Sequence, residues 1–146
     1  MGQYYKIVNL DKREYLHPHN FGDGAKLWEF GSSGMGTMFG LALLLANGNG
    51  QGGGDFQVRR PEDLELVGRW AGDRIVVVGD YANEWPGEGD LYMRCALGEG
   101  GFKDISEELL GMMLQDSWYR ESVMENPGYL MRKELEKLGF LPGGEG

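Results

Sequence analysis

The chain has 146 residues, and its 14 Lys and Arg against 23 Asp and Glu give it a formal net charge of −9. Hydrophobic residues make up 41% and charged residues 25%, a composition typical of a folded domain and too apolar for wholesale disorder. An acidic surface repels phosphate backbones and anionic membranes, and no apolar run approaches the ~20 residues of a membrane span. We therefore expect one globular domain over 1–146 that binds neither nucleic acid nor membranes.

Cysteine and glycine are the two unusual residue types. Cys95 is the one cysteine, so no intramolecular disulfide can form, and the N-terminus lacks the apolar stretch of a secretory signal. These features predict a cytoplasmic protein. Residues 47–54 hold five glycines and nothing to bury, which predicts a flexible loop, and a frayed tail is expected over 142–146.

The N-terminal third contains three candidate strands and one candidate helix. Aromatic and β-branched residues predict a β-hairpin from 4–10 and 13–16. Residues 26–30 alternate weakly and suggest a third short strand. The segment 38–46 is apolar all round, which predicts a buried helix that begins at Gly36 or Thr37.

The remainder combines strands with C-terminal helices. The Val-rich run at 74–81 predicts a central strand covered on both faces, paired with a strand at 66–70. Residues 91–97 fit either a strand or a short helix. The spacing of a capping box predicts a helix over 106–125, broken at Gly111 or Asp116, and an apolar stripe predicts a last helix that Gly139 ends.

These elements together predict an α+β fold. We expect a mainly antiparallel sheet of about five or six strands, one buried helix after the Gly-rich loop, and two C-terminal helices packed on one face.

The segment before the buried helix is the first candidate site. Its glycines let backbone N–H groups converge, and the helix N-terminus and hydroxyls add positive potential and donors, which suits a phosphate or carboxylate. The predicted ligand-binding residues are Gly31, Ser32, Ser33, Gly34, Gly36, Thr37, Arg69 and Arg74. No Lys-Ser/Thr pair of a P-loop follows. In the alternative interpretation the glycines serve only close packing and the arginines pair with surface carboxylates.

A loop with two histidines is the second candidate. His17, His19 and Asp23 carry the imidazole and carboxylate groups that bind divalent metals, and Asp80 ends the best predicted strand. Because a full ligand set cannot be named, the alternative is an ordinary loop with an exposed or capping histidine. No nucleophile motif is present, and we expect Cys95 to be a buried small hydrophobe.

Two segments of the sequence resemble segments of other proteins. The opening MGQYYKIVNLD and the block GRWAGDRIVVVGDY at 68–81 resemble segments shared by a group of small bacterial and phage proteins that have no assigned activity. The resemblance covers residues 1–82. It implies a cytoplasmic microbial or phage protein, and it implies no cofactor or catalytic residue.

Three functions are therefore carried forward. The first is a non-enzymatic binding module for a small anionic or phosphate-bearing ligand. The alternative is a protein-interaction or regulatory domain whose acidic surface binds a basic partner. The third is a metal-dependent hydrolase that uses His17, His19, Asp23 and Asp80 with a divalent metal. The pattern leaves the oligomeric state open.

Overall fold

The computed structural model describes residues 3–32, 35–47, 56–125 and 127–142. Residues 48–54 of the predicted flexible loop and residues 143–146 of the predicted tail lie outside this part. Within the described residues, no helix has the length and hydropathy that a membrane crossing requires.

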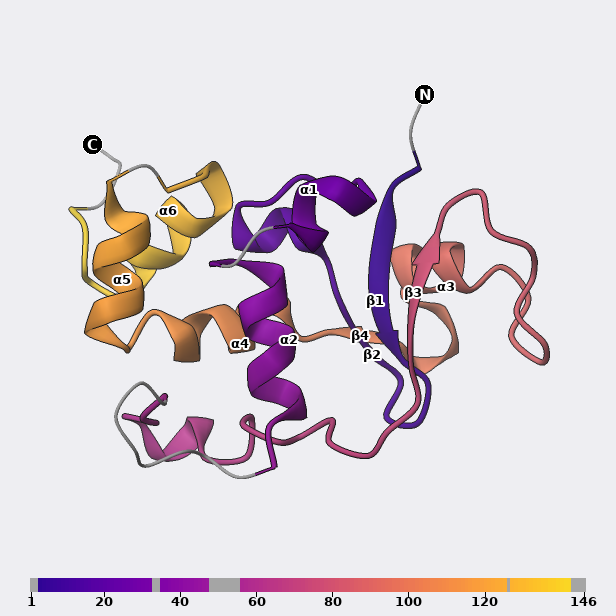
Figure 1. The fold of residues 1–146 in the computed structure, drawn as a ribbon, viewed down its shortest axis with the longest axis horizontal. Helices are drawn as coiled ribbons and strands as arrows, with labels where there is room; N and C mark the ends of the chain where they lie inside the picture. The colour runs from indigo at the N-terminus through magenta and orange to yellow at the C-terminus, as the bar shows by residue number, and fades with distance from the viewer. Residues whose placement is uncertain (1–2, 33–34, 48–55, 126, 143–146) are drawn as a thin grey trace.

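A four-stranded mixed sheet forms the centre of the fold (Figure 1). Its strands are β1 (Tyr5–Asn9), β2 (Glu14–Leu16), β3 (Ile75–Gly79) and β4 (Lys103–Asp104), in the order β3-β1-β2-β4. β1 pairs antiparallel with both β2 and β3, and β4 adds parallel to β2. The predicted N-terminal hairpin and the mainly antiparallel sheet are confirmed.

The helices lie on both sides of this sheet. They are the 3-10 turns η1 (Pro18–Phe21), η2 (Pro61–Asp63) and η3 (Glu99–Gly101) and the α-helices α1 (Leu27–Gly31), α2 (Thr37–Leu45), α3 (Leu91–Leu97), α4 (Ser106–Met113), α5 (Ser117–Met124) and α6 (Tyr129–Lys137). In Figure 1, α2, α4, α5 and α6 gather at one side of the sheet, and α3 lies beside β3 at the other. The α+β fold class is confirmed.

Neighbouring residues of β1 belong to two different hydrophobic clusters. Ile7 joins the large cluster formed with α2, α4 and α6, whereas Val8 joins a small cluster with Val78 of β3 and Cys95 of α3. This alternation follows from the period of two in a strand. Cys95 is fully buried, as expected, and burial raises the pKa of its thiol to about 12.

The strand predicted at 26–30 is wrong, because these residues begin α1. The Glu29 carboxylate accepts a hydrogen bond from the Lys26 N–H (3.1 Å), and the Glu29 N–H donates back to the Lys26 carbonyl (2.9 Å). Such a reciprocal pair stabilises the first turn of a helix. In this helix Phe30 is buried and Trp28 is 84% exposed. Over only five residues, an alternation of apolar and polar side chains therefore fits one helical turn as well as a strand.

The strand predicted at 66–70 is also wrong, since the segment forms consecutive turns. The Gly68 and Trp70 N–H groups donate to the carbonyls of Leu43 and Leu44 at the end of α2 (both 2.9 Å). β3 therefore pairs with β1, and it is an edge strand rather than a central one. Its Val77 side chain is accordingly 41% exposed.

The described residues form fewer strands and more helices than predicted. Residues 91–97 are the helix α3, capped by the Asp90 carboxylate, which accepts from the Met93 N–H (3.1 Å). The predicted break occurs at Asp116, whose carboxylate caps α5, so that three C-terminal helices replace the expected two. The last helix and the helix after the Gly-rich loop are confirmed as α6 and α2.

Candidate functional site

The N-terminus of α2 is occupied by a carboxylate of the protein itself. Asp23 Oδ2 lies 2.7 Å from both the N and the Oγ1 of Thr37 and accepts hydrogen bonds from both. A Cβ at Gly36 would collide with the same carboxylate, so Gly36 serves this close approach. Ser33 and Gly34 lie outside the described residues. The anion observed at the N-terminus of α2 is thus a side chain of the protein itself.

The two predicted ligand-binding arginines lie near the β1–β2 hairpin and are both bonded to carboxylates. Arg69 Nε and Nη2 donate to both oxygens of Glu14, and the Trp70 Nε1–H donates to the same carboxylate (2.8 Å). Arg74 Nε donates to the exposed Asp11 (2.9 Å). Both arginines are therefore paired with carboxylates and are not unpaired cations beside the described residues of the segment 31–37.

Burial defines the chemistry at Glu14. The residue is 6% exposed, and burial raises the pKa of its carboxyl, but the hydrogen bonds from Arg69 and Trp70 outweigh burial. The resulting pKa lies below the ordinary value. Glu14 is therefore a satisfied internal anion that ties β2 to the turns before β3.

The predicted metal ligands are only partly brought together. The rings of His17 and His19 lie 4.8 Å apart, but Asp23 is bonded to Thr37, and Asp80 accepts the Tyr4 N–H (3.1 Å). Throughout the described part of the chain, no group of three or more His, Cys, Asp or Glu is placed to hold a metal ion.

His17 is a neutral, partly buried histidine rather than an evident ligand. Its Nδ1 is buried and has no hydrogen-bond partner among the described residues. Burial, and after it the charges of Lys6 and His19, lower the pKa of His17 to about 4. Its backbone N–H donates to Ser106 Oγ (2.8 Å) and so joins the end of β2 to the start of α4.

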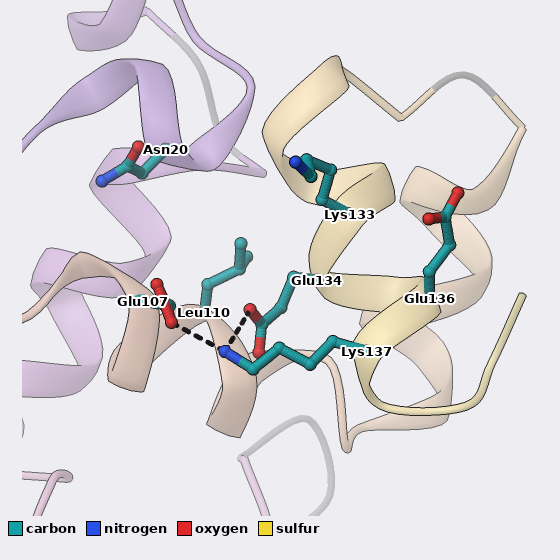
Figure 2. Close-up of a pocket in the computed structure, with 7 residues that line it drawn as sticks. All are labelled: Asn20, Glu107, Leu110, Lys133, Glu134, Glu136 and Lys137. Atoms are coloured by element: carbon teal, nitrogen blue, oxygen red, sulfur yellow. Dashed lines mark hydrogen bonds and ion pairs between the residues drawn. The ribbon is translucent and has the colours of Figure 1, made fainter. Parts of the chain in front are cut away.

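A pocket of about 610 Å³ lies between η1, α4 and α6 (Figure 2). Its volume falls in the ~300–1,000 Å³ typical of ligand pockets. Its lining residues are Asn20, Glu107, Leu110, Lys133, Glu134, Glu136 and Lys137. None of them was among the residues predicted from the sequence.

Glu134 is the unusual group in this pocket. It is 8% exposed, its carboxylate lies 3.7 Å from the Lys137 ammonium, and the charge of Arg60 also acts on it. That ammonium lies 2.7 Å from Glu107 Oε1 and reaches across the pocket in Figure 2. Burial raises the pKa of Glu134, and the charges of Lys137 and Arg60 oppose this shift without cancelling it.

One sequence signal pointed to Glu134. Met131 and Leu135 are buried on the inner face of α6. Glu134 lies three residues after Met131 and next to Leu135, so the helical period places it on that face. Because glutamates commonly flank the apolar stripe of surface helices, this position alone does not predict burial. Glu134 is buried because α4 and η1 pack against α6 at this point.

Comparison with models of protein families, with curated proteins and with solved structures gives no match for the chain. The function is therefore inferred from the geometry alone.

Proposed function

We propose that the protein is a non-enzymatic interaction domain whose acidic surface binds a basic partner, a protein or a peptide rich in Arg or Lys. The proposal includes the cytoplasmic location that the sequence predicts. It adopts the second of the three functions considered above.

The supporting observation is that internal ion pairs neutralise most cations and leave an excess of acids. Of the 14 Lys and Arg, eight have a carboxylate within 4.0 Å. The pairs are Lys12–Asp73, Arg13–Glu88, Arg60–Asp63, Arg69–Glu14, Arg74–Asp11, Arg94–Glu88, Lys103–Glu108 and Lys137–Glu107.

Several carboxylates remain exposed and unpaired. No cation in the described residues lies within 4.0 Å of the exposed Glu65, Glu84, Glu99, Glu121 or Glu125. Unpaired surface charges of one sign steer an oppositely charged partner and favour its association.

The other two functions draw less support from the geometry. An anionic ligand at the segment 31–37 would compete with Asp23 for the N-terminus of α2, and Arg69 and Arg74 are already bonded. The hydrolase hypothesis gains no supporting observation, because Asp23 and Asp80 bond to groups other than the two histidines.

The experiment is a binding titration with fluorescent peptides of equal length, one Arg-rich, one Lys-rich and one Glu-rich. We expect the basic peptides to bind at low salt, with an affinity that falls as salt screens the attraction. The Glu-rich peptide should not bind. Binding of neither basic peptide, or an affinity indifferent to salt, would overturn the proposal, and a thermal shift with inorganic phosphate would favour the small-anion alternative.

A further inference from the structure

The two edge strands of the sheet differ in how well they are protected against further pairing. β4 has two residues, and its exposed Lys103 places a charge at that edge. β3, the other edge, is five residues long, has the sequence IVVVG and contains neither Lys nor Pro (Figure 1). Short length, Lys and Pro are the features that keep an edge strand from pairing with another chain. β3 is therefore the edge at which a further strand can add to the sheet.

The hydrogen bonds at the two ends of β3 show which of its backbone groups are free. The Arg74 carbonyl and the Asp80 N–H bond to backbone groups that flank β1 (both 2.9 Å). Because the bonding direction alternates along an antiparallel strand, the N–H and C=O groups of Ile75, Val77 and Gly79 point away from β1. Within the described part of the chain, no group bonds to these backbone atoms of Ile75 and Val77.

This free edge is complementary to itself in one antiparallel register. With a two-fold axis at Val77, the outward groups of Val77 meet those of Val77 in a second copy, and Ile75 meets Gly79. The Val77 side chain, 41% exposed, then packs against its counterpart. The same register places Arg74 of each copy directly across from Asp80 of the other. Opposite charges at such positions stabilise strand pairing, whereas an in-register parallel alignment would place like charges together.

Both charged side chains retain bonding capacity for this contact. The Arg74 side chain is 73% exposed, and its bonds to Asp11 use only part of a guanidinium that has five N–H donors. Asp80 accepts the Tyr4 N–H through Oδ1, and its Oδ2 has no bond within the described residues. The cross-strand ion pairs therefore add to the bonds already present without replacing them.

We infer that β3 is an interface between two copies of this chain, which pair antiparallel about Val77 and join their sheets into one. The inference goes beyond the proposed function, because it concerns a different surface and a different partner. Each copy contributes its four strands, in the order β4-β2-β1-β3 from the outside to the axis. The outer edges of the joined sheet are then the short β4 strands, so the assembly closes at two copies.

Analytical ultracentrifugation over a range of protein concentrations tests this inference. It is carried out at physiological salt, where the long-range repulsion between two acidic copies is largely screened. With rising concentration, wild type should change from the mass of one chain to twice that mass. Val77→Lys places two ammonium groups at the axis and should abolish the dimer. Because Val77 is 41% exposed, the fold should tolerate this substitution, and thermal melts check that it does.

Two charge reversals test the register. Arg74→Asp and Asp80→Arg each place like charges across from one another at both symmetric positions, so each should raise the dissociation constant of the dimer roughly tenfold or more. An equimolar mixture of the two variants should dimerise again, because every cross-strand pair then joins opposite charges. The controls Arg132→Asp and Glu121→Arg, at exposed positions of α6 and α5, change the net charge equally and should have little effect.

Three results would overturn the inference. They are a wild type that stays monomeric up to its solubility limit, a dimer that Val77→Lys leaves intact, and a mixture of the two reversal variants that does not dimerise. A monomeric wild type whose binding of the Arg-rich peptide is lost in Val77→Lys would assign the edge to the basic partner instead. The proposed function is tested separately, since it depends on the peptide titration and not on the oligomeric state.

Discussion

Glu14 and Glu134 are two buried glutamates that the fold treats in opposite ways. They are 6% and 8% exposed, so their desolvation is similar. Glu14 accepts hydrogen bonds from Arg69 and Trp70, and its pKa lies below the ordinary value. Glu134 has the Lys137 ammonium at 3.7 Å and the charge of Arg60 nearby, yet burial outweighs them and raises its pKa.

The difference teaches that the burial of a carboxylate and its hydrogen bonding have to be considered separately. Burial alone does not separate them, because both are covered to the same extent. The separation comes from hydrogen-bond satisfaction, since a fully bonded anion has nothing left to offer a ligand. Substitutions at each residue can test this contrast.

The largest expected effect is at Glu14. Glu14→Ala leaves the buried Trp70 indole N–H without an acceptor and Arg69 without its partner, which should lower the free energy of unfolding by about 3 kcal/mol. Urea denaturation of wild type and variant measures this change. Arg74→Ala, which removes the exposed Asp11 pair, is the control and should leave the denaturation midpoint nearly unchanged. Equal effects would contradict the structural role of Glu14.

Asp23 provides a second test of a satisfied carboxylate. Asp23→Ala removes both hydrogen bonds to Thr37, and helix N-cap losses of this kind cost about 1–2 kcal/mol. Thermal unfolding should show the lower stability, and Asp23→Asn should recover part of it because an amide oxygen still accepts. An unchanged melting temperature for Asp23→Ala would show that the α2 N-terminus does not depend on this cap.

His17 extends the comparison from a buried anion to a buried base. Its pKa is lowered from 6.5 to about 4 in the folded protein, so the folded state binds fewer protons than the unfolded state between these values. Its stabilising contribution is therefore present above pH 6.5 and is lost as the pH falls toward 4.

Because the His17 ring is partly exposed, solvent screening reduces its contribution, and the expected loss in the free energy of unfolding is roughly 1–2 kcal/mol. Wild type should lose more stability in this pH range than His17→Gln does, as measured by denaturant titrations at several pH values. The variant His19→Gln keeps the buried His17 ring, so it should still lose stability in this pH range, but by less than wild type because one charge that lowers the His17 pKa is gone.

The smallest expected effect on stability is at Glu134. Its pKa is raised in the folded state, so its charge opposes folding at neutral pH, and that penalty is relieved as the pH falls through the folded pKa. Glu134→Gln should thus leave stability unchanged or raise it by less than about 1 kcal/mol at neutral pH, with the difference shrinking in acid. A marked destabilisation would place Glu134 with Glu14 as a structural residue.

The accuracy of the sequence predictions followed the range of the interactions involved. The N-terminal hairpin, α2 and α6 are set by local patterns, and these were predicted. The five-residue alternation at 26–30 was too short to separate a strand from a helix, and the back-bonding of Glu29 decided it. Residues 66–70 form turns rather than the predicted strand, and in them Trp70 bonds to Glu14, which is 56 residues away in the chain.

The candidate site was harder to predict than the fold. The Gly-rich segment drew attention as an anion site, but an aspartate 14 residues earlier fills the helix N-terminus that a ligand would use. The pocket beside Glu134 went unpredicted, since α4, α6 and η1 each supply only part of it and none carries a motif.

The sequence by itself determined the acidic charge, the α+β class and most helix positions, because charge is additive and amphipathic periodicity and capping act within a few residues. Tertiary structure alone decided which carboxylates are satisfied. Glu14 and Glu134 are the same residue type, and the direct hydrogen bonds that Arg69 and Trp70 donate to Glu14, against the looser ion pair at Glu134, shift their pKa values in opposite directions.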